Sequence, residues 1–402
     1  MGIRIIFSEN EQIINSNFKN SKNTLIVFTP AIDKKNKILN YFKSNNFKIV
    51  KRADLLADIV NSSFCIAIAG THGKTTTTSI LSHILHNSEL KFTSFIGGVL
   101  NKYESNIMIK GSKIFIVEAD EYDKTFLKIK PNIASILNID GDHYDIYNDI
   151  DDINNSFKKF ANNLKKNGIL FHNSTLNFNG ISFGEDSFAE AKIINKKNYN
   201  DKLIFDIQYQ NNVYKNIVLN MLGDHNAFNA MAAFIIAISL DIESEIIIKA
   251  LKTFPGIKRR FSVELKNPKI FIDDYAHHPS EIESIYNSVK SLYPNKKKLV
   301  IFQPHLFSRT RDFLREFAEA LEKFDKIALL DIYPAREKPI SGVSSKSIFD
   351  KINNKNKVLI EKSEIPELLF EDEHELVISM GAGDIGDLVE TIKKTIIDQN
   401  EN

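Results

Sequence analysis

The sequence contains a single cysteine, Cys65, and this excludes a framework of disulfide bonds. Cys65 lies inside an apolar run, where we expect a buried structural thiol. Charge of one sign is also lacking: the formal net charge is +1, which gives no indication of a nucleic-acid partner or a basic membrane patch. Because no signal peptide and no apolar run long enough to span a bilayer occur, we expect a cytoplasmic protein with no membrane partner.

The length of 402 residues allows two or three domains, each with its own core. The pattern of strands and helices predicts an α/β fold in three regions, residues 1–62, 63–255 and 256–402. Strands and helices alternate in the second and third regions as in parallel sheets, and the third region is typical of a doubly wound domain. Residues 168–220 are rich in short β-runs and turns, which predicts either an antiparallel appendage or an edge continuation of the sheet.

The clearest motif is Gly70-Thr71-His72-Gly73-Lys74-Thr75, which follows an apolar strand at 64–69 and precedes a helix at 76–86. Glycines let backbone N–H groups approach phosphates, and the helix N-terminus adds partial positive charge. In such a loop Lys74 reaches the β- and γ-phosphates of ATP and the Thr75 hydroxyl binds Mg²⁺. The alternative is an ordinary glycine-containing turn, but the strand–loop–helix context favours nucleotide binding.

Acidic side chains follow the next two predicted strands. Glu118 to Asp123 ends the strand at 114–118, and Asn138, Asp140, Asp142, His143 and Asp145 end the strand at 133–139. Ligands bind at the carboxyl ends of parallel strands, so a carboxylate there can coordinate the Mg²⁺ of ATP. A solvated acidic turn is the alternative.

Two further motifs allow two interpretations each. Asn226 and Asn229 share one face of a helix's first turn, where their amides can read an adenine edge or cap the helix. Arg259 and Arg260 begin the third region, where they can neutralise phosphate charge when domains close or form a surface pair.

Two motifs of the third region also follow strands. Asp273-Asp274-Tyr275-Ala276-His277-His278-Pro279 comes after one strand, and Gln303 to Asp312, which contains Arg309 and Arg311, comes after the next. A guanidinium in a loop at that edge suits a bidentate grip on a substrate carboxylate.

Together these motifs, with a glycine loop at Gly381 to Gly386, resemble the Mur ligases over nearly the whole chain and in the same order. The branch most similar to it joins L-alanine to UDP-N-acetylmuramate during peptidoglycan precursor synthesis. The resemblance implies a Rossmann-like domain for the UDP-sugar, a central ATPase domain and a C-terminal amino-acid domain. It also implies ATP and Mg²⁺ as cofactors, and an acyl phosphate that the amine of alanine attacks.

The resemblance assigns roles to individual residues. It implies that ATP is bound by Gly70, Thr71, Gly73, Lys74, Thr75, Thr76, Asn226, Asn229, Arg260 and Asp274. Metal ligation is implied for Thr75, Glu118 and His143, and contact with the amino-acid substrate for Tyr275, His277, Arg309 and Arg311. Lys74, His143, Arg260 and His277 are the implied catalytic residues, with His277 as the base for the ammonium proton.

Several alternatives stay open at this point. Members of the family normally begin with a glycine-rich strand–loop–helix, so we expect a shortened first domain here. A tripeptide-recycling Mur ligase shares several motifs, although Ser308 to Asp312 favours the L-alanine branch. A nucleotide-binding but inactive remnant is a further possibility. We expect a monomer or a homodimer.

Overall fold

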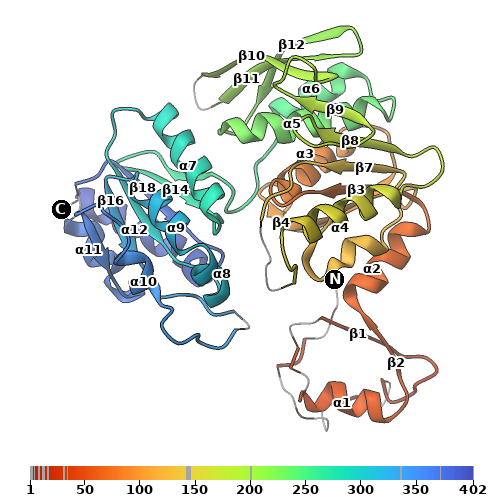
Figure 1. Cartoon of the computed structure of the whole chain (residues 1–402), viewed down its shortest axis with the longest axis horizontal. Helices are drawn as coiled ribbons and strands as arrows, with labels where there is room; N and C mark the ends of the chain where they lie inside the picture. The colour runs from red at the N-terminus through yellow and green to blue at the C-terminus, as the bar shows by residue number, and fades with distance from the viewer. Residues whose placement is uncertain are drawn as a thin grey trace.

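The computed structural model contains three sheets, one for each predicted region of the chain (Figure 1). It describes residues 3–401 except 4, 8, 9, 11–13, 16, 17, 30, 31, 34, 142–145, 200, 201, 336 and 372. The predicted α/β class is confirmed, and the boundaries at 62 and 255 stay predictions. No helix within these described ranges combines the length and apolar character needed to cross a bilayer.

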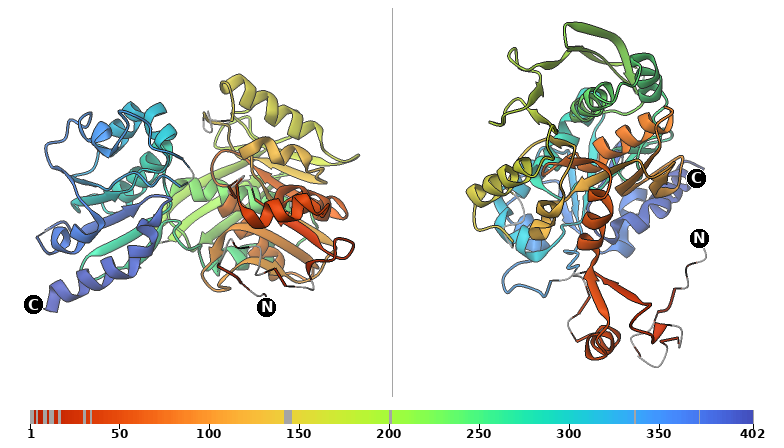
Figure 2. Two further views of the ribbon diagram at one scale, coloured as in Figure 1. Left: turned by 90° about the horizontal axis from the view of Figure 1, so that it is seen from below. Right: turned by 90° about the vertical axis from the view of Figure 1, so that its right-hand side faces the viewer.

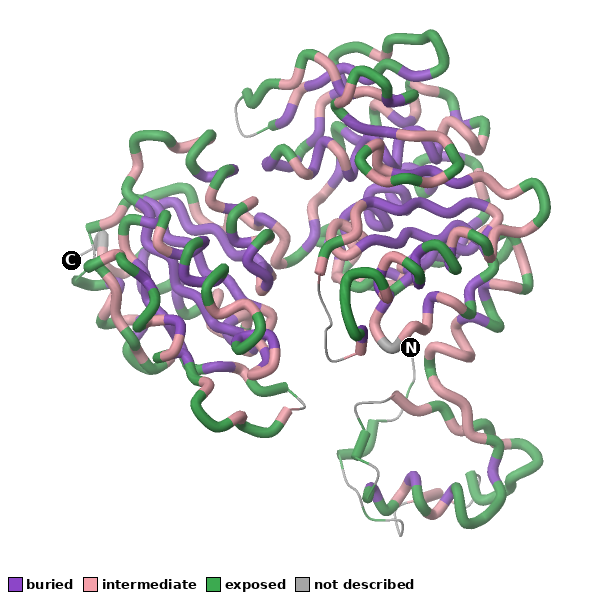
Figure 3. The backbone as a smooth tube through the Cα atoms, in the orientation of Figure 1, coloured by how far each residue is buried: buried purple, intermediate pink, exposed green. Residues whose placement is uncertain are grey.

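The N-terminal unit is small and largely exposed (Figure 3). Its elements are β1 (Leu25–Phe28), α1 (Lys37–Ser44), β2 (Lys48–Lys51) and α2 (Arg52–Asn61). β1 and β2 pair in parallel as a two-stranded sheet. The described residues 5–7 form no strand. From the side, this unit projects away from the two larger ones (Figure 2).

The central unit is built on a ten-stranded sheet of order β12-β11-β10-β9-β8-β7-β3-β6-β4-β5. Its strands are β3 (Phe64–Ala69), β4 (Phe92–Leu100), β5 (Ser105–Ile109), β6 (Ile114–Ala119), β7 (Ile133–Ile136), β8 (Ile169–Asn173), β9 (Ile181–Gly184), β10 (Ala191–Tyr199), β11 (Lys202–Tyr209) and β12 (Asn212–Leu219). Its helices are α3 (Lys74–His86), the 3₁₀ helix η3 (Tyr122–Lys128), α4 (Ile150–Asn162), α5 (Asp224–Ile238) and α6 (Ser244–Lys252). β8 to β10 continue the sheet in parallel at its edge, and β11 and β12 add two antiparallel strands to it. Residues 168–220 are therefore an edge continuation of the sheet whose last strands are antiparallel.

Helices cover both faces of this sheet. The side chains of β3 point alternately to the two faces, and its apolar residues are buried on each. Ile66 and Ile68 pack with α3, α5 and α6 in one core, whereas Cys65, Ala67 and Ala69 pack with α2 and α4 in another. Burial raises the pKa of Cys65 to about 12, which confirms the expected buried thiol. The carboxyl end of β3 is thereby held rigidly, and the loop 70–73 starts there.

The C-terminal unit is a six-stranded sheet of order β13-β14-β18-β15-β16-β17, parallel except for β13. Its strands are β13 (Ser262–Leu265), β14 (Ile270–Asp274), β15 (Lys298–Phe302), β16 (Lys326–Leu329), β17 (Lys357–Leu359) and β18 (Leu376–Met380). Its helices are α7 (Pro279–Leu292), α8 (Phe307–Asp312), α9 (Leu314–Leu321), α10 (Ser345–Phe349), α11 (Ile365–Glu371), α12 (Val389–Glu401) and the 3₁₀ helices η4 (Lys362–Glu364) and η5 (Asp384–Leu388). α7, α9 and α10 cover one face and α11 and α12 the other, so the predicted doubly wound domain is confirmed.

One buried imidazole in the central unit predicts acid sensitivity. His83 of α3 is 2% exposed, with Nδ1 2.8 Å from the Tyr103 hydroxyl and Nε2 3.3 Å from the Thr253 hydroxyl. Burial, assisted by the nearby charge of Lys102, lowers the pKa of His83 to about 4. The unfolded chain binds a proton at this residue below about pH 6.5, whereas the folded chain stays neutral there until about pH 4.

We therefore expect His83 to remove about 2 kcal/mol of unfolding free energy between pH 6.5 and 5. His83→Gln keeps a polar side chain that does not titrate, so its unfolding free energy should fall less over that interval. Urea unfolding of both proteins at the two pH values measures the difference. Parallel pH dependence in wild type and variant would show that His83 is not the responsible group.

Candidate functional site

The loop between β3 and α3 has the backbone geometry of a phosphate loop. Gly70 and Gly73 adopt φ angles of +138° and +82°, in the region that favours glycine. A Cβ on Gly73 would lie 2.4 Å from Oδ1 of Asn229, so a side chain would also collide with α5. Gly73 precedes the first turn of α3, whose N–H groups point toward the loop opening.

Lys74 is held by the loop and by an acidic side chain. Its Nζ donates to the carbonyls of Gly70 at 2.6 Å and Thr71 at 3.1 Å, and pairs with Oε2 of Glu121 at 2.7 Å. Burial alone would lower the pKa of Lys74, but the charges of Glu121, Asp120 and Glu118 outweigh it and raise the pKa. The cation is therefore fixed at the mouth of the loop.

Thr75 and Glu118 form an oxygen pair beside Lys74. The Thr75 hydroxyl donates to Oε2 of Glu118 at 3.0 Å, and the other carboxylate oxygen accepts from the N–H of Gly97 on β4. Burial raises the pKa of Glu118, opposed by these hydrogen bonds and by Lys74. The Thr75 hydroxyl and the Glu118 carboxylate are two of the groups for which the resemblance implies metal ligation.

Two described residues after β7, Asn138 and Asp140, hold the loop in place. Asn138 accepts from the N–H of His72 at 2.7 Å and donates to its carbonyl at 3.1 Å, while Oδ2 of Asp140 lies 3.3 Å from Nε2 of the His72 ring. His143, the predicted third ligand, lies outside the described residues, as do Asp142 and Asp145. In the part of the chain that the structure describes, no group of three or more His, Cys, Asp or Glu side chains could hold a metal ion.

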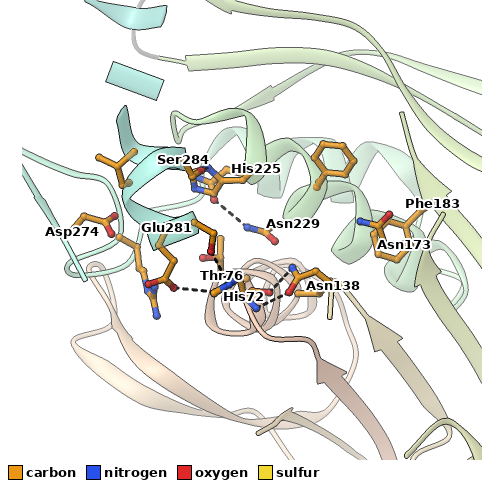
Figure 4. A pocket seen from close by; sticks show the side chains of 17 residues that line it. His72, Thr76, Asn138, Asn173, Phe183, His225, Asn229, Asp274, Glu281 and Ser284 are labelled. Atoms are coloured by element: carbon orange, nitrogen blue, oxygen red, sulfur yellow. Dashed lines mark hydrogen bonds and ion pairs between the residues drawn. The ribbon is translucent and has the colours of Figure 1, made fainter. Parts of the chain in front are cut away.

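A cavity of about 300 Å³ opens beside the loop, between the central and C-terminal units (Figure 4). The residues that line it come from both units and include Gly73, Thr76, Asn173, Phe183, His225, Asn226, Phe228, Asn229, Arg260, Asp274 and Ile285. The size and the mixture of apolar and polar walls are typical of a small-molecule site.

One of the two interpretations of Asn226 and Asn229, helix capping, is contradicted by the structure, whereas the adenine contact stays a prediction. The N-cap of α5 is Gly223, and Asn226 donates instead to the carbonyl of Leu222 at 2.5 Å. Asn229 donates to Oδ1 of Asn226 at 3.2 Å and accepts from the Thr77 hydroxyl at 3.3 Å. Helix capping is therefore wrong, and both amides are fixed in the cavity wall.

Arg259 and Arg260 are adjacent in sequence but differ in surroundings. Arg259 pairs with Oδ2 of Asp273 at 3.2 Å and donates to the carbonyls of Gly381 and Gly383 at 2.5 and 3.3 Å. Arg260 lines the cavity. The Tyr275 ring receives both guanidiniums, at 5.2 Å from Arg259 and 5.1 Å from Arg260.

Asp274 is fixed by backbone donors at the cavity wall. Its carboxylate accepts from the N–H groups of Phe261 at 2.6 Å and Ala276 at 2.7 Å. Burial raises the pKa of Asp274 to about 7, although the charge of Arg260 opposes the shift. Asp274 lines the cavity, and the contact with ATP that the resemblance implies for it stays a prediction.

The predicted amino-acid contacts gather at the ends of β14 and β15, with one exception. The ring of His277 lies 5.3 Å from that of Tyr275 and 5.8 Å from that of His305, and the buried Arg309 places Nη1 3.4 Å from Nδ1 of His305. Arg311 is 56% exposed and pairs with Asp312 at 2.7 Å. No contact between Arg311 and that group occurs among the described residues, and its role stays a prediction.

Sequence reasoning assigned no role to His72, Glu281, Ser284 or His225, which the structure places in the cavity wall. Ser284 of α7 lies 2.8 Å from Nδ1 of His225 in the first turn of α5, and burial lowers the pKa of His225 to about 4. His72 and Glu281 form an ion pair between the two units. The position of His72 inside the phosphate loop was the available signal. Glu281 lies two residues after the motif that ends at Pro279, and its partner His72 is more than two hundred residues away in the sequence.

Comparison with known proteins supports the same architecture. The profile of the Mur ligase middle domain matches residues 68–237, and that of the Mur ligase glutamate ligase domain matches residues 259–383. A UDP-N-acetylmuramate–L-alanine ligase of Christiangramia forsetii is 46% identical over 379 residues, covering 94% of this chain and 84% of the relative. That of Flavobacterium psychrophilum is 44% identical over 396 residues, covering 98% and 88%.

A solved structure agrees with the fold. The UDP-N-acetylmuramate–alanine ligase MurC of Thermotoga maritima superposes with a TM-score of 0.77 at 25% identity, over 96% of this chain and 88% of that one. With two matching family profiles, relatives above 40% identity and the phosphate loop in place, the chain belongs to the Mur ligase family.

Proposed function

We propose that this protein joins L-alanine to UDP-N-acetylmuramate at the expense of ATP. One observation carries the proposal: residues of the phosphate loop and of the C-terminal unit, Gly73 and Arg260 among them, line one cavity between the two units. Glu281, which also lines it, binds the backbone N–H of His277 and so connects the Tyr275–His277 group to the cavity wall. A ligase that activates a carboxylate with ATP needs this juxtaposition, because the phosphoryl group and the amine must meet at one carbon. The full-length relatives named as L-alanine ligases give the substrates.

In the proposed reaction the lactyl carboxylate attacks the γ-phosphorus of ATP, and ADP leaves. The amine of alanine then attacks the acyl carbon, and the bond to the phosphate oxygen breaks. The protein supplies no nucleophile. Lys74 and Arg260 stabilise the charge on the phosphoryl oxygens, and His277 accepts the proton of the attacking ammonium group.

Nucleotide binding is assigned to the walls of the cavity. We propose that Gly70, Thr71, Gly73 and Thr76 contact the phosphates, Asn226 or Asn229 the adenine, and Asp274 the ribose. Tyr275, Arg309 and Arg311 are the proposed contacts of the amino acid. The Arg309 guanidinium lies in a largely buried position, where a bidentate pair with a carboxylate is strong.

Mg²⁺ fits the oxygen pair of Thr75 and Glu118. A hydroxyl and a carboxylate within hydrogen-bonding distance are hard donors, and Mg²⁺ commonly takes only one or two protein ligands beside substrate phosphates. We propose these two residues, with His143, as its holders. When bound, the ion neutralises charge on the phosphate oxygens during transfer.

Glu118→Gln tests the metal assignment. The amide keeps the size of the side chain and can still hydrogen-bond Thr75, but it removes the anionic ligand. We expect the Mg²⁺ concentration for half-maximal activity to rise about 10-fold or more. Titrating Mg²⁺ in a phosphate-release assay measures this, with the exposed Glu104→Gln as control. An unchanged Mg²⁺ requirement would remove Glu118 from the proposed ligands.

The proposed function is tested by omission. Purified protein is given ATP and Mg²⁺ with UDP-N-acetylmuramate, L-alanine, both or neither, and phosphate release is followed. Release that needs both substrates supports the proposal. Release with a tripeptide in place of L-alanine would favour the recycling ligase, and ATP binding without release would favour an inactive remnant.

A further inference from the structure

An ion pair connects the phosphate loop to the C-terminal unit. Nδ1 of His72, in the loop before α3, lies 3.3 Å from Oε1 of Glu281, in the first turn of α7 (Figure 4). The two side chains are 19% and 17% exposed and line the cavity that the proposed function assigns to ATP. The proposed chemistry uses neither of them.

His72 is anchored so that its ring cannot turn away from this contact without losing others. Its main chain is bound twice by Asn138. On the far side of the ring, Nε2 lies 3.3 Å from Oδ2 of Asp140 and 3.1 Å from the Ser280 hydroxyl. Burial would lower the pKa of His72, but Asp140 and Glu281 outweigh burial and raise the pKa to about 9, so the ring is charged at neutral pH.

The two carboxylate oxygens of Glu281 contact different parts of the site, the phosphate loop and the segment that contains His277. Oε1 faces His72, whereas Oε2 accepts from the backbone N–H groups of His277 at 2.9 Å and His278 at 3.2 Å. Oε2 also lies 3.3 Å from Nδ1 of the His277 ring. One carboxylate therefore contacts both His72 and His277.

The same contacts favour one tautomer of His277. Nδ1 lies 2.9 Å from the carbonyl oxygen of Tyr275 as well as near Glu281, and both groups accept hydrogen bonds. A proton on Nδ1 satisfies them and leaves the lone pair of the neutral ring on Nε2. A base needs that lone pair.

We propose that His72 and Glu281 are positioning residues that couple the nucleotide loop to the base of the second half-reaction. This inference rests on the proposed function and specifies how its two subsites are connected. Closure of the C-terminal unit on the loop makes the His72–Glu281 pair, and the pair sets the place and tautomer of His277. Formation of the acyl phosphate does not require the pair, whereas its aminolysis does.

The test separates the two half-reactions. Hydroxylamine, a strong nucleophile that needs no base, traps the acyl phosphate as a hydroxamate, whereas L-alanine reports the complete reaction. We compare Glu281→Gln, His72→Asn and the double variant with wild type. Because both side chains line the cavity assigned to ATP, the rates are compared at saturating ATP. We expect alanine-dependent turnover to fall roughly 10-fold or more beyond any loss of hydroxamate formation. The double variant should be no slower than the slower single variant.

Glu283→Gln is the matched control, because Glu283 lies on the same helix and pairs with Lys323 within the C-terminal unit. Its two rates should equal those of wild type. Equal losses in both half-reactions, additive effects in the double variant, or losses that follow a lowered unfolding temperature would overturn the inference. A wild-type protein that forms neither product would instead overturn the proposed function, and this inference with it.

Discussion

Replacing Lys74 by methionine is expected to lower ATP-driven phosphate release by about 10³-fold or more. Its ammonium group lies at the opening of the phosphate loop, held by two loop carbonyls and by Glu121. It is therefore preorganised to stabilise charge that develops on the phosphoryl oxygens, and a preorganised donor contributes most in a site shielded from water. Steady-state phosphate release at saturating substrates measures the loss.

A loss of folding has to be separated from a loss of catalysis here. Glu121 is 2% exposed, so removing Lys74 leaves a buried carboxylate without its cation. We therefore include Lys74→Met/Glu121→Gln, which should recover the unfolding temperature but not the activity. Lys128→Met is the control, because Lys128 pairs with Asp54 on the protein surface. Lys74→Met activity within 10-fold of wild type would contradict the assigned role.

Alanine variants of the neighbours Arg259 and Arg260 are expected to differ, one losing stability and the other losing activity. Arg260→Ala should lower kcat about 10²-fold and change the unfolding temperature little, because its guanidinium lines the cavity. Arg259→Ala should instead destabilise the C-terminal unit by about 3 kcal/mol, since Asp273 is 1% exposed and would lose its charged partner. Arg259→Ala also removes the hydrogen bonds that the guanidinium donates to the carbonyls of Gly381 and Gly383.

Calorimetry and steady-state kinetics on the two variants measure these effects together. The expected pattern is one variant with wild-type stability and low kcat, and one with a lowered unfolding temperature. Arg259→Lys and Arg260→Lys form a second pair of variants. Lysine keeps the positive charge but lacks the planar guanidinium group, which in Arg259 spans Asp273 and the glycine loop. Identical behaviour of the two alanine variants would contradict the separate roles.

The sequence predicted the phosphate loop well because its determinants are local. A buried strand, two glycines and a helix start occupy one continuous segment, and each was found where expected. β4, which contains Gly97 and Gly98, was not among the predicted strands. The structure gives their reason: a Cβ on Gly97 would lie 2.6 Å from Glu118 and one on Gly98 2.9 Å from Thr75.

The partners of the site residues could not be predicted in the same way. That Asn226 lines a cavity depends in part on where the C-terminal unit lies, and no local pattern encodes that position. The difference between Arg259 and Arg260 likewise depends on the glycine loop more than a hundred residues later. Chemistry at strand ends was predictable from local sequence, whereas pairing across the two units required the fold.

Transfer of an oxygen atom tests the central claim most directly. UDP-N-acetylmuramate labelled with ¹⁸O in its lactyl carboxylate is incubated with the protein, ATP, Mg²⁺ and L-alanine, and the released phosphate is examined by mass spectrometry. Attack by the carboxylate on ATP followed by attack of the amine on carbon leaves one labelled oxygen in each phosphate. Phosphate without label, released at the rate of product formation, would contradict an acyl-phosphate ligase.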